Sequence, residues 1–137
     1  MNGDRIISIE LPEAKILARQ MEKRLPGKHI ISYHMQDCGK PQKIGMVNKD
    51  LNEFDSLTNA DIKAVITRGN VVLLKLGNDT SLILGPEYGG EILYFKDTKM
   101  APEKFHLKVD FSDGTALTAK LTSMGVIQIM RDMVVIQ

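Results

Sequence analysis

The sequence predicts a mainly β fold of the α+β class: a two-layer antiparallel β-sandwich with an N-terminal helix and a possible second short helix. Three observations predict it. Residues 12–25 carry apolar side chains at helical spacing. From residue 61 onward, short apolar runs alternate with turn residues, a pattern typical of a sandwich or barrel. The chain has 137 residues, the length of one domain, and contains no repeat or low-complexity tract.

The N-terminal helix is expected over residues 12–25. Pro12 suits the first helical position, where its missing amide hydrogen costs nothing. Glu13 follows in the first turn, where the helix dipole favours a negative charge. Pro26-Gly27 ends the helix. One face is apolar and consists of Ala14, Leu17, Ala18, Met21 and Leu25.

The chain after this helix is expected to form a short strand over residues 29–35 and a loop over residues 37–49. A second short helix is expected within residues 50–59. The remaining strands are expected over residues 61–67, 71–76, 81–84, 92–95, 105–111, 117–121 and 126–130. Gly77-Asn78-Asp79 is expected to form a turn, and Ser112-Asp113-Gly114 is the strongest hairpin signal in the chain.

Composition limits the classes of function. Eighteen Lys and Arg residues nearly balance seventeen Asp and Glu residues, so the net charge of +1 excludes a domain that holds nucleic acid by bulk positive charge. A single cysteine, Cys38, excludes an internal disulfide or a multi-cysteine zinc site and indicates a reducing compartment. The sequence also lacks an apolar run long enough to span a bilayer and the apolar stretch of a signal peptide. A cytoplasmic location with no membrane partner is therefore expected.

Standard enzyme motifs are absent from the sequence, including the phosphate-binding loop, the dinucleotide-binding glycines and the zinc-protease and serine-hydrolase motifs. The three histidines, His29, His34 and His106, do not have the spacing of metal ligands, and we expect them to be solvated or structural. Cys38 lies in a polar segment and is expected to be incidental. No cofactor is expected in this chain.

Five short segments occur in an order that a known family shares. They are Glu10-Leu11-Pro12-Glu13, Leu25-Pro26-Gly27-Lys28-His29-Ile30, Thr67-Arg68-Gly69-Asn70-Val71-Val72-Leu73-Leu74, Glu87-Tyr88-Gly89-Gly90, and the stretch from Lys104-Phe105-His106 to Ser112-Asp113-Gly114. Over about residues 9–130, the ordered set resembles the N-terminal domain of the Fpg/Nei family, the formamidopyrimidine and endonuclease VIII type DNA glycosylases.

The resemblance implies a two-layer β-sandwich with flanking helices that forms one wall of a DNA cleft. In the family the other wall is a helix–two-turn–helix domain, usually followed by a zinc finger. The sequence ends at Gln137, so residues 1–137 are expected to be one N-terminal-type domain with residues 1–8 as an extension. Zinc is expected only if a further C-terminal zinc finger exists. The chain is then either a free-standing half or a fragment of a longer protein.

The sequence departs from the family at its reactive positions. The family's nucleophile is an N-terminal proline whose amine forms a Schiff base with the damaged nucleoside. Ile9 stands there, and the eight residues before it make its nitrogen an amide. The family's strand lysine falls on Asn70. The residues that fill the gap left by the flipped base fall near Tyr88, Ser123 and Met124, so the arginine is lost while Tyr88 and Met124 can still act as wedges.

Two carboxylates of the family persist. Glu10 corresponds to the glutamate beside the nucleophile, and Glu13 to the glutamate of the first helical turn, which makes both candidate catalytic residues. The alternative is that they only cap the helix or serve the scaffold. The candidate DNA-binding residues are Lys15, Arg19, Arg68, Tyr88, Lys104, His106 and Met124, with Lys23, Lys75 and Lys108 as further phosphate contacts.

Three functions follow as hypotheses. The first is a DNA-repair domain of the base-excision type, related to DNA glycosylases and AP lyases. It binds damaged or abasic duplex DNA without Schiff-base chemistry, with a dissociation constant of about 10⁻⁴–10⁻⁶ M. The second is an active hydrolase by an altered route, in which cleavage before Ile9 frees a primary amine beside Glu10. The third is a non-enzymatic module that binds a protein partner or a second copy through the exposed interdomain face.

Overall fold

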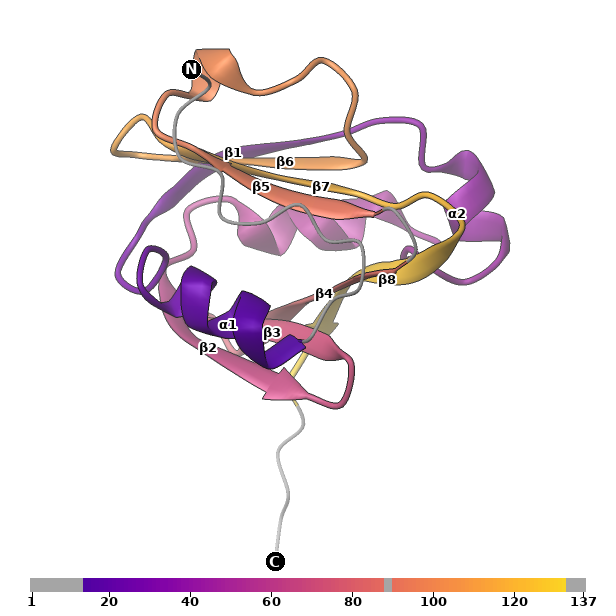
Figure 1. The fold of residues 1–137 in the computed structure, drawn as a ribbon, viewed down its shortest axis with the longest axis horizontal. Coiled ribbons are helices and arrows are strands. Elements are labelled where there is room, and N and C mark those ends of the chain that lie inside the picture. Colours follow the sequence, from indigo (N-terminus) through magenta and orange to yellow (C-terminus); the bar gives the residue numbers. More distant parts are fainter. Residues whose placement is uncertain (1–13, 88–89, 133–137) are drawn as a thin grey trace, which may run out of the picture.

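A computed structural model describes residues 14–87 and 90–132 (Figure 1). The helices are α1 (Ala14–Glu22), α2 (Gly39–Lys43) and the two 3₁₀ helices η1 (Leu51–Leu57) and η2 (Thr98–Met100). The strands are β1 (Ile30–Met35), β2 (Ile62–Arg68), β3 (Val71–Leu76), β4 (Thr80–Glu87), β5 (Glu91–Phe95), β6 (Leu107–Phe111), β7 (Ala116–Lys120) and β8 (Met124–Arg131). Within this described part, no helix is long and apolar enough to cross a membrane.

The strands form two antiparallel sheets of four strands each, which lie one above the other in Figure 1. The strand order is β1-β6-β7-β5 in one sheet and β2-β3-β4-β8 in the other. The predicted fold class, a mainly β two-layer sandwich with few helices, is therefore confirmed. The chain passes between the sheets in three connections, from β1 to β2, from β4 to β5 and from β7 to β8.

The core lies between the sheets, because alternate residues of each strand point inward. Val65, Leu74, Leu82 and Ile129 are paired in register across β2, β3, β4 and β8, and all four are buried. The facing sheet contributes a similar set of buried side chains, namely Tyr94, Leu107, Val109, Phe111, Leu117 and Ala119. The alternation of apolar and polar residues predicted for these strands thus places the apolar side chains of each sheet on its inner face.

The N-terminal helix is shorter than predicted. Its apolar face is correct, since Leu17 and Met21 are almost completely buried. The prediction that it extends to residue 25 is wrong, because α1 ends at Glu22. The residues that follow are held by β2 instead: the Gly27 N–H donates to the Ile62 carbonyl (2.8 Å), and the Ile62 N–H donates to the Lys28 carbonyl (2.9 Å). Residues 12 and 13 lie outside the described residues.

The prediction of a loop over residues 37–49 is wrong in part, because α2 lies within it. Pro41 of this helix is buried, and the Gln42 N–H donates to the Cys38 carbonyl (2.8 Å). Cys38 itself is buried rather than solvated, and its thiol donates to the Gln36 carbonyl (3.3 Å). Burial raises the pKa of the Cys38 thiol, with a further rise from the nearby Asp37 carboxylate. The buried thiol is therefore a core side chain.

The remaining differences concern where elements begin and end. The second short helix is present as η1, a 3₁₀ helix capped by the Asp50 side chain, which accepts from the Asn52 N–H (2.9 Å). The predicted hairpin is confirmed by the hydrogen bond from the Phe111 N–H to the Thr115 carbonyl (2.9 Å). Strand β8 is longer than residues 126–130, because its pairing with β4 runs the full length of both strands.

Candidate nucleic-acid interface

Four strand ends meet at one edge of the β2-β3-β4-β8 sheet. Strand β2 ends at Arg68, which pairs with Val71 at the beginning of β3. Two strands further along, Glu87 at the end of β4 pairs with Met124 at the beginning of β8. Because antiparallel neighbours alternate in direction, these residues mark the same edge of the sheet.

The other sheet has an equivalent edge. There, Glu91 at the beginning of β5 pairs with Lys120 at the end of β7, and Leu107 at the beginning of β6 pairs with Met35 at the end of β1. The short connections at residues 88–90 and 121–123 join this edge to the first one. The two edges therefore form one end of the sandwich, on the right in Figure 1, which we call the loop end.

The N-terminus of helix α1 faces the loop end, and the helix runs away from it. It runs antiparallel to β2, since Gly27, which follows the helix, bonds to Ile62 at the beginning of that strand. Arg19 is exposed and lies with residues 65–67 of β2 along a shallow groove. Lys15 lies in the first turn, although its side chain is not among those that the structure describes.

Most predicted binding residues for which the structure describes side chains lie at the loop end. Arg68 is exposed at the end of β2, and Met124 is 52% exposed at the beginning of β8. Three strand spacings separate them, or roughly 15 Å. Lys104 is exposed just before β6. Asn70, at the position of the family's lysine, lies exposed in the β2–β3 turn beside Gly69, whose φ of +61° suits glycine.

Several predicted residues lie outside the described residues. They are Ile9, Glu10, Glu13 and Tyr88. The structure therefore gives no geometry for the two carboxylates or for the tyrosine wedge. Two of the further lysine candidates are engaged within the fold: Lys75 pairs with Asp132 (2.7 Å), and Lys108 lies 3.5 Å from an Asp110 carboxylate oxygen.

His106 has a structural contact that the sequence did not predict. Its ring is half-buried, and Nδ1 accepts the Leu121 N–H (2.8 Å), so the neutral ring carries its proton on Nε2. Burial lowers the pKa of His106, and Lys120 lowers it further, whereas Asp37 opposes them. A neutral His106 therefore holds the connection between β7 and β8 in place. The remaining Nε2–H is a donor that this bond does not use.

We expect the stability of the protein to fall as the pH drops below about 6.5, because the unfolded chain then takes up a proton that the folded His106 resists. His106→Asn keeps an acceptor without a titrating ring and is expected to flatten this dependence. His106→Leu leaves the buried Leu121 N–H without an acceptor and is expected to cost about 1–3 kcal/mol of unfolding free energy at pH 7.5. Urea titrations between pH 5 and pH 7.5 test both. An unchanged slope in His106→Asn would show that another group titrates.

A cavity of about 340 Å³ opens beside His106 at the loop end. Its lining combines polar and apolar side chains: Asp37, Lys40, Pro41, Ile44, Met46, His106, Leu121, Thr122 and Ser123. Across residues 14–87 and 90–132, no cluster of histidine, cysteine and carboxylate side chains has the arrangement of a metal site. The described part of the loop end thus combines exposed cations with the exposed Asp37 carboxylate, the exposed Met124 thioether and neutral hydrogen-bonding groups.

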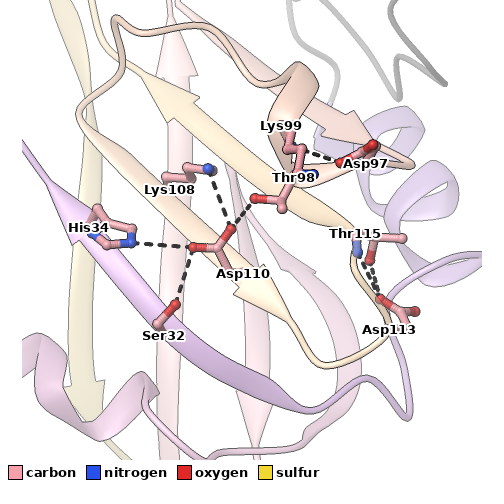
Figure 2. Close-up of polar contacts among 9 residues, drawn as sticks. All are labelled: Ser32, His34, Asp97, Thr98, Lys99, Lys108, Asp110, Asp113 and Thr115. Carbon is pink, nitrogen blue, oxygen red and sulfur yellow. Dashed lines mark hydrogen bonds and ion pairs between the residues drawn. The ribbon is translucent and has the colours of Figure 1, made fainter.

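Sequence reasoning missed a polar cluster on the outer face of the other sheet. Figure 2 shows the Asp110 carboxylate at its centre, accepting from the Ser32 hydroxyl (3.2 Å) and the Thr98 hydroxyl. His34 Nε2 lies 3.4 Å from the same carboxylate. Strand alternation places Asp110 on the outer face, where Thr98 of η2 reaches its carboxylate and the side chain is buried. No local signal in the sequence identifies such a contact.

Most of the chain matches the model of one protein family. Residues 9–120 match the family model of the formamidopyrimidine-DNA glycosylase N-terminal domain. The chain belongs to this family. The match extends through β7 and includes every candidate site residue except Met124.

Individual relatives agree with the family match. The chain is 30% identical over 108 residues to a formamidopyrimidine-DNA glycosylase (Fpg) of Ligilactobacillus salivarius, covering 79% of this chain and 37% of that protein. It is 30% identical over 118 residues to the enzyme of Lactococcus lactis, covering 85% of this chain and 41% of that protein. The chain therefore spans about two fifths of the length of these curated relatives.

Solved structures share the fold at higher coverage. The complex between Lactococcus lactis Fpg and DNA containing an abasic site superposes with a TM-score of 0.73 and 27% identity, covering 90% of this chain and 44% of that one. A structure of MutM in complex with DNA containing carbocyclic 8-oxo-G superposes with a TM-score of 0.72 and 28% identity, covering 90% of this chain and 45% of that one. Both of these Fpg-type proteins were solved with DNA bound.

Proposed function

We propose that this Fpg-type N-terminal domain binds duplex DNA at damaged or abasic sites through its loop end, and that the chain does so without forming a Schiff base. The observation that carries the proposal is the superposition of 90% of the chain on an Fpg bound to abasic-site DNA. The loop end adds a chemical reason. It gathers exposed cations beside an exposed apolar side chain. The cations suit the phosphates of a DNA backbone, and the apolar side chain suits the gap that a missing base leaves in the stack.

Three exposed residues of the loop end carry this proposal. Arg68 and Lys104 are exposed and suited to phosphate oxygens, which accept from guanidinium and ammonium groups. Met124 is an exposed apolar side chain that can enter the space left by a missing base. With a net charge of +1, the domain has little long-range attraction for DNA, so we expect weak, salt-sensitive binding with a dissociation constant of about 10⁻⁴–10⁻⁶ M.

The absence of Schiff-base chemistry rests on two positions. Ile9 replaces the family's proline, and its nitrogen lies in a peptide bond because residues 1–8 precede it. An amide nitrogen is not a nucleophile of the kind that forms an imine. Asn70 replaces the strand lysine and cannot carry a positive charge. We therefore propose that this chain binds the damaged site in DNA but does not cleave the DNA through a Schiff base.

The binding proposal is tested with fluorescently labelled duplexes that differ only in one abasic-site analogue. Lys104→Ala is expected to weaken binding to both duplexes and to reduce the salt slope by about 1, because it removes one phosphate contact. Lys99→Ala is the matched control. Lys99 is also exposed, but it lies on η2, which is bonded through Thr98 to Gly114 in the hairpin at the opposite end of the sandwich.

The same titrations separate lesion recognition from backbone binding. Met124→Ala is expected to reduce the preference for the abasic duplex while leaving affinity for the intact duplex unchanged. Equal losses in Lys104→Ala and Lys99→Ala would place DNA elsewhere on the surface. If wild-type protein shows no preference for the abasic duplex at any salt concentration, recognition of the damaged site is refuted.

A further inference from the structure

The connection from β7 to β8 leads directly to Met124, the side chain that the proposed function places in the gap of an abasic site. Leu121 is buried at the beginning of this connection, whereas Thr122 and Ser123 are exposed. Gly125 follows Met124 with a φ of +132°. Because glycine adopts many backbone conformations, the local sequence does not set the direction in which Met124 points. Contacts from other parts of the fold have to set it.

The downstream side of Met124 is held by neighbouring strands and by the segment after α2. Met124 pairs with Glu87 of β4. The Ile127 N–H donates to the Met46 carbonyl (2.9 Å). These bonds fix the body of β8, but they do not fix the connection that precedes it.

The upstream side of Met124 is held by His106. Its ring Nδ1 accepts the N–H of Leu121 (2.8 Å), three residues before Met124. The backbone of His106 is fixed on both sides, since its N–H donates to the Ala119 carbonyl (3.0 Å) and its carbonyl accepts the Gln36 N–H (3.1 Å). A side chain whose backbone is held in this way is a rigid support for the bond that it accepts.

The cavity beside His106 increases the importance of this bond. Thr122 and Ser123 of the connection line the cavity together with His106. On this side the connection therefore adjoins open space instead of packed side chains. A segment with few packed contacts depends more strongly on its hydrogen bonds.

We infer that His106 is a positioning residue for recognition of the damaged site. By accepting the Leu121 N–H, it fixes the beginning of the connection and so sets the position of Met124. Because it gives His106 a part in DNA recognition, this inference rests on the proposed function. The role belongs to Nδ1, whereas a direct contact with DNA would use Nε2–H, the remaining donor of the neutral ring.

Two substitutions separate the two ring nitrogens. His106→Asn keeps an acceptor at the position of Nδ1 and removes the group at Nε2. His106→Gln places an amide at the reach of Nε2 and leaves the Leu121 N–H without its acceptor. The readout is the ratio of the affinities for the abasic and the intact duplex at one salt concentration. Loss of folded protein lowers both apparent affinities equally and leaves this ratio unchanged.

His106→Asn is expected to keep the wild-type ratio. His106→Gln is expected to lower it about fivefold, the factor that corresponds to one ordinary hydrogen bond. His29→Gln is the matched control, because His29 is also half-buried but its carbonyl accepts the Ser112 N–H in the hairpin at the opposite end of the sandwich. It is expected to keep the wild-type ratio. A lowered ratio in His106→Asn, or an unchanged one in His106→Gln, overturns the positioning role.

A double substitution tests whether His106 acts through Met124. If it does, His106→Gln combined with Met124→Ala is expected to give the same ratio as Met124→Ala alone. Losses that add would show that His106 acts by another route and would overturn the inference.

Hydrogen exchange of the DNA-free protein provides a readout that does not depend on the proposed function. The amides of residues 121–125 are expected to exchange faster in His106→Gln than in wild type or His106→Asn, because the connection is released. Unchanged exchange in His106→Gln refutes the positioning role by itself. A wild-type protein without preference for the abasic duplex refutes the proposed function and the part of His106 in it. If wild type shows the preference and His106→Gln retains it, only the inference about His106 fails.

Discussion

Incubation of the full chain with a duplex that carries one abasic site, followed by borohydride, is expected to give no covalent adduct. A Schiff base requires an unprotonated amine at the reacting carbon. In this sequence the nitrogen beside Glu10 is the amide of Ile9, and Asn70 stands where the family has a lysine. Non-covalent binding is expected to persist in the same samples when borohydride is omitted.

A redesigned chain provides the positive control for this experiment. It begins at position 9, with Ile9→Pro as its first residue, and carries Asn70→Lys, so that a secondary amine is free beside Glu10. An adduct with this variant alone confirms that the two positions account for the difference in chemistry. An adduct with the unmodified chain contradicts the prediction, and peptide mapping then identifies the amine. A native form whose intact mass corresponds to a start at Ile9 would instead support catalysis by a primary amine.

Asp110→Ala is expected to lower the free energy of unfolding by about 3 kcal/mol. Asp110 is only 8% exposed, and its carboxylate accepts from the hydroxyls of Ser32 and Thr98 (Figure 2). It is also the counter-ion of Lys108, whose side chain is 18% exposed. Alanine leaves two hydroxyls and the Lys108 ammonium group without their acceptor. A buried polar group that has lost its partner lowers the free energy of unfolding by its full desolvation penalty, which exceeds the net contribution of an ordinary hydrogen bond.

Two matched variants separate the charge of Asp110 from its hydrogen bonds. Asp110→Asn keeps an acceptor of the same shape and is expected to cost less than Asp110→Ala. Asp97→Ala removes an exposed carboxylate that caps η2 through the Lys99 N–H (2.9 Å), and is expected to cost about 1 kcal/mol. Urea unfolding at pH 7 measures all three. If Asp110→Ala and Asp97→Ala lower the free energy of unfolding by the same amount, the burial of Asp110 does not strengthen its contacts.

Local sequence patterns predicted which segments form the sheets. The alternation in residues 105–111 and the turn at Ser112-Asp113-Gly114 both depend on near neighbours, and the observed hairpin joins β6 to β7 as expected. The same reasoning failed for α2, whose five residues have no apolar periodicity of their own. It also overextended the first helix, because bonds from Gly27 and Lys28 to the distant Ile62 decide where the chain leaves the helix.

The candidate site was predicted only in part. The resemblance selected Arg68, Lys104 and Met124, which come from three separate turns, but no local pattern shows that these turns meet. His106 was predicted as a DNA contact, and that role stays a prediction. Its hydrogen bond to Leu121 was not predicted, because it joins the segment before β6 to the connection after β7.

The residue pattern alone was enough to predict the β-rich class, the positions of most strands and the family, with Ile9 and Asn70 in place of the family's proline and lysine. These follow from residue identity and from the period of the apolar pattern, which are local properties. Two features required the three-dimensional structure: the separate turns come together as one loop end, and Thr98 of η2 reaches the buried Asp110 carboxylate. Both features depend on strand order and on where the chain crosses between the sheets. Pairing between distant segments and burial of the shared core set these, so no local pattern encodes them.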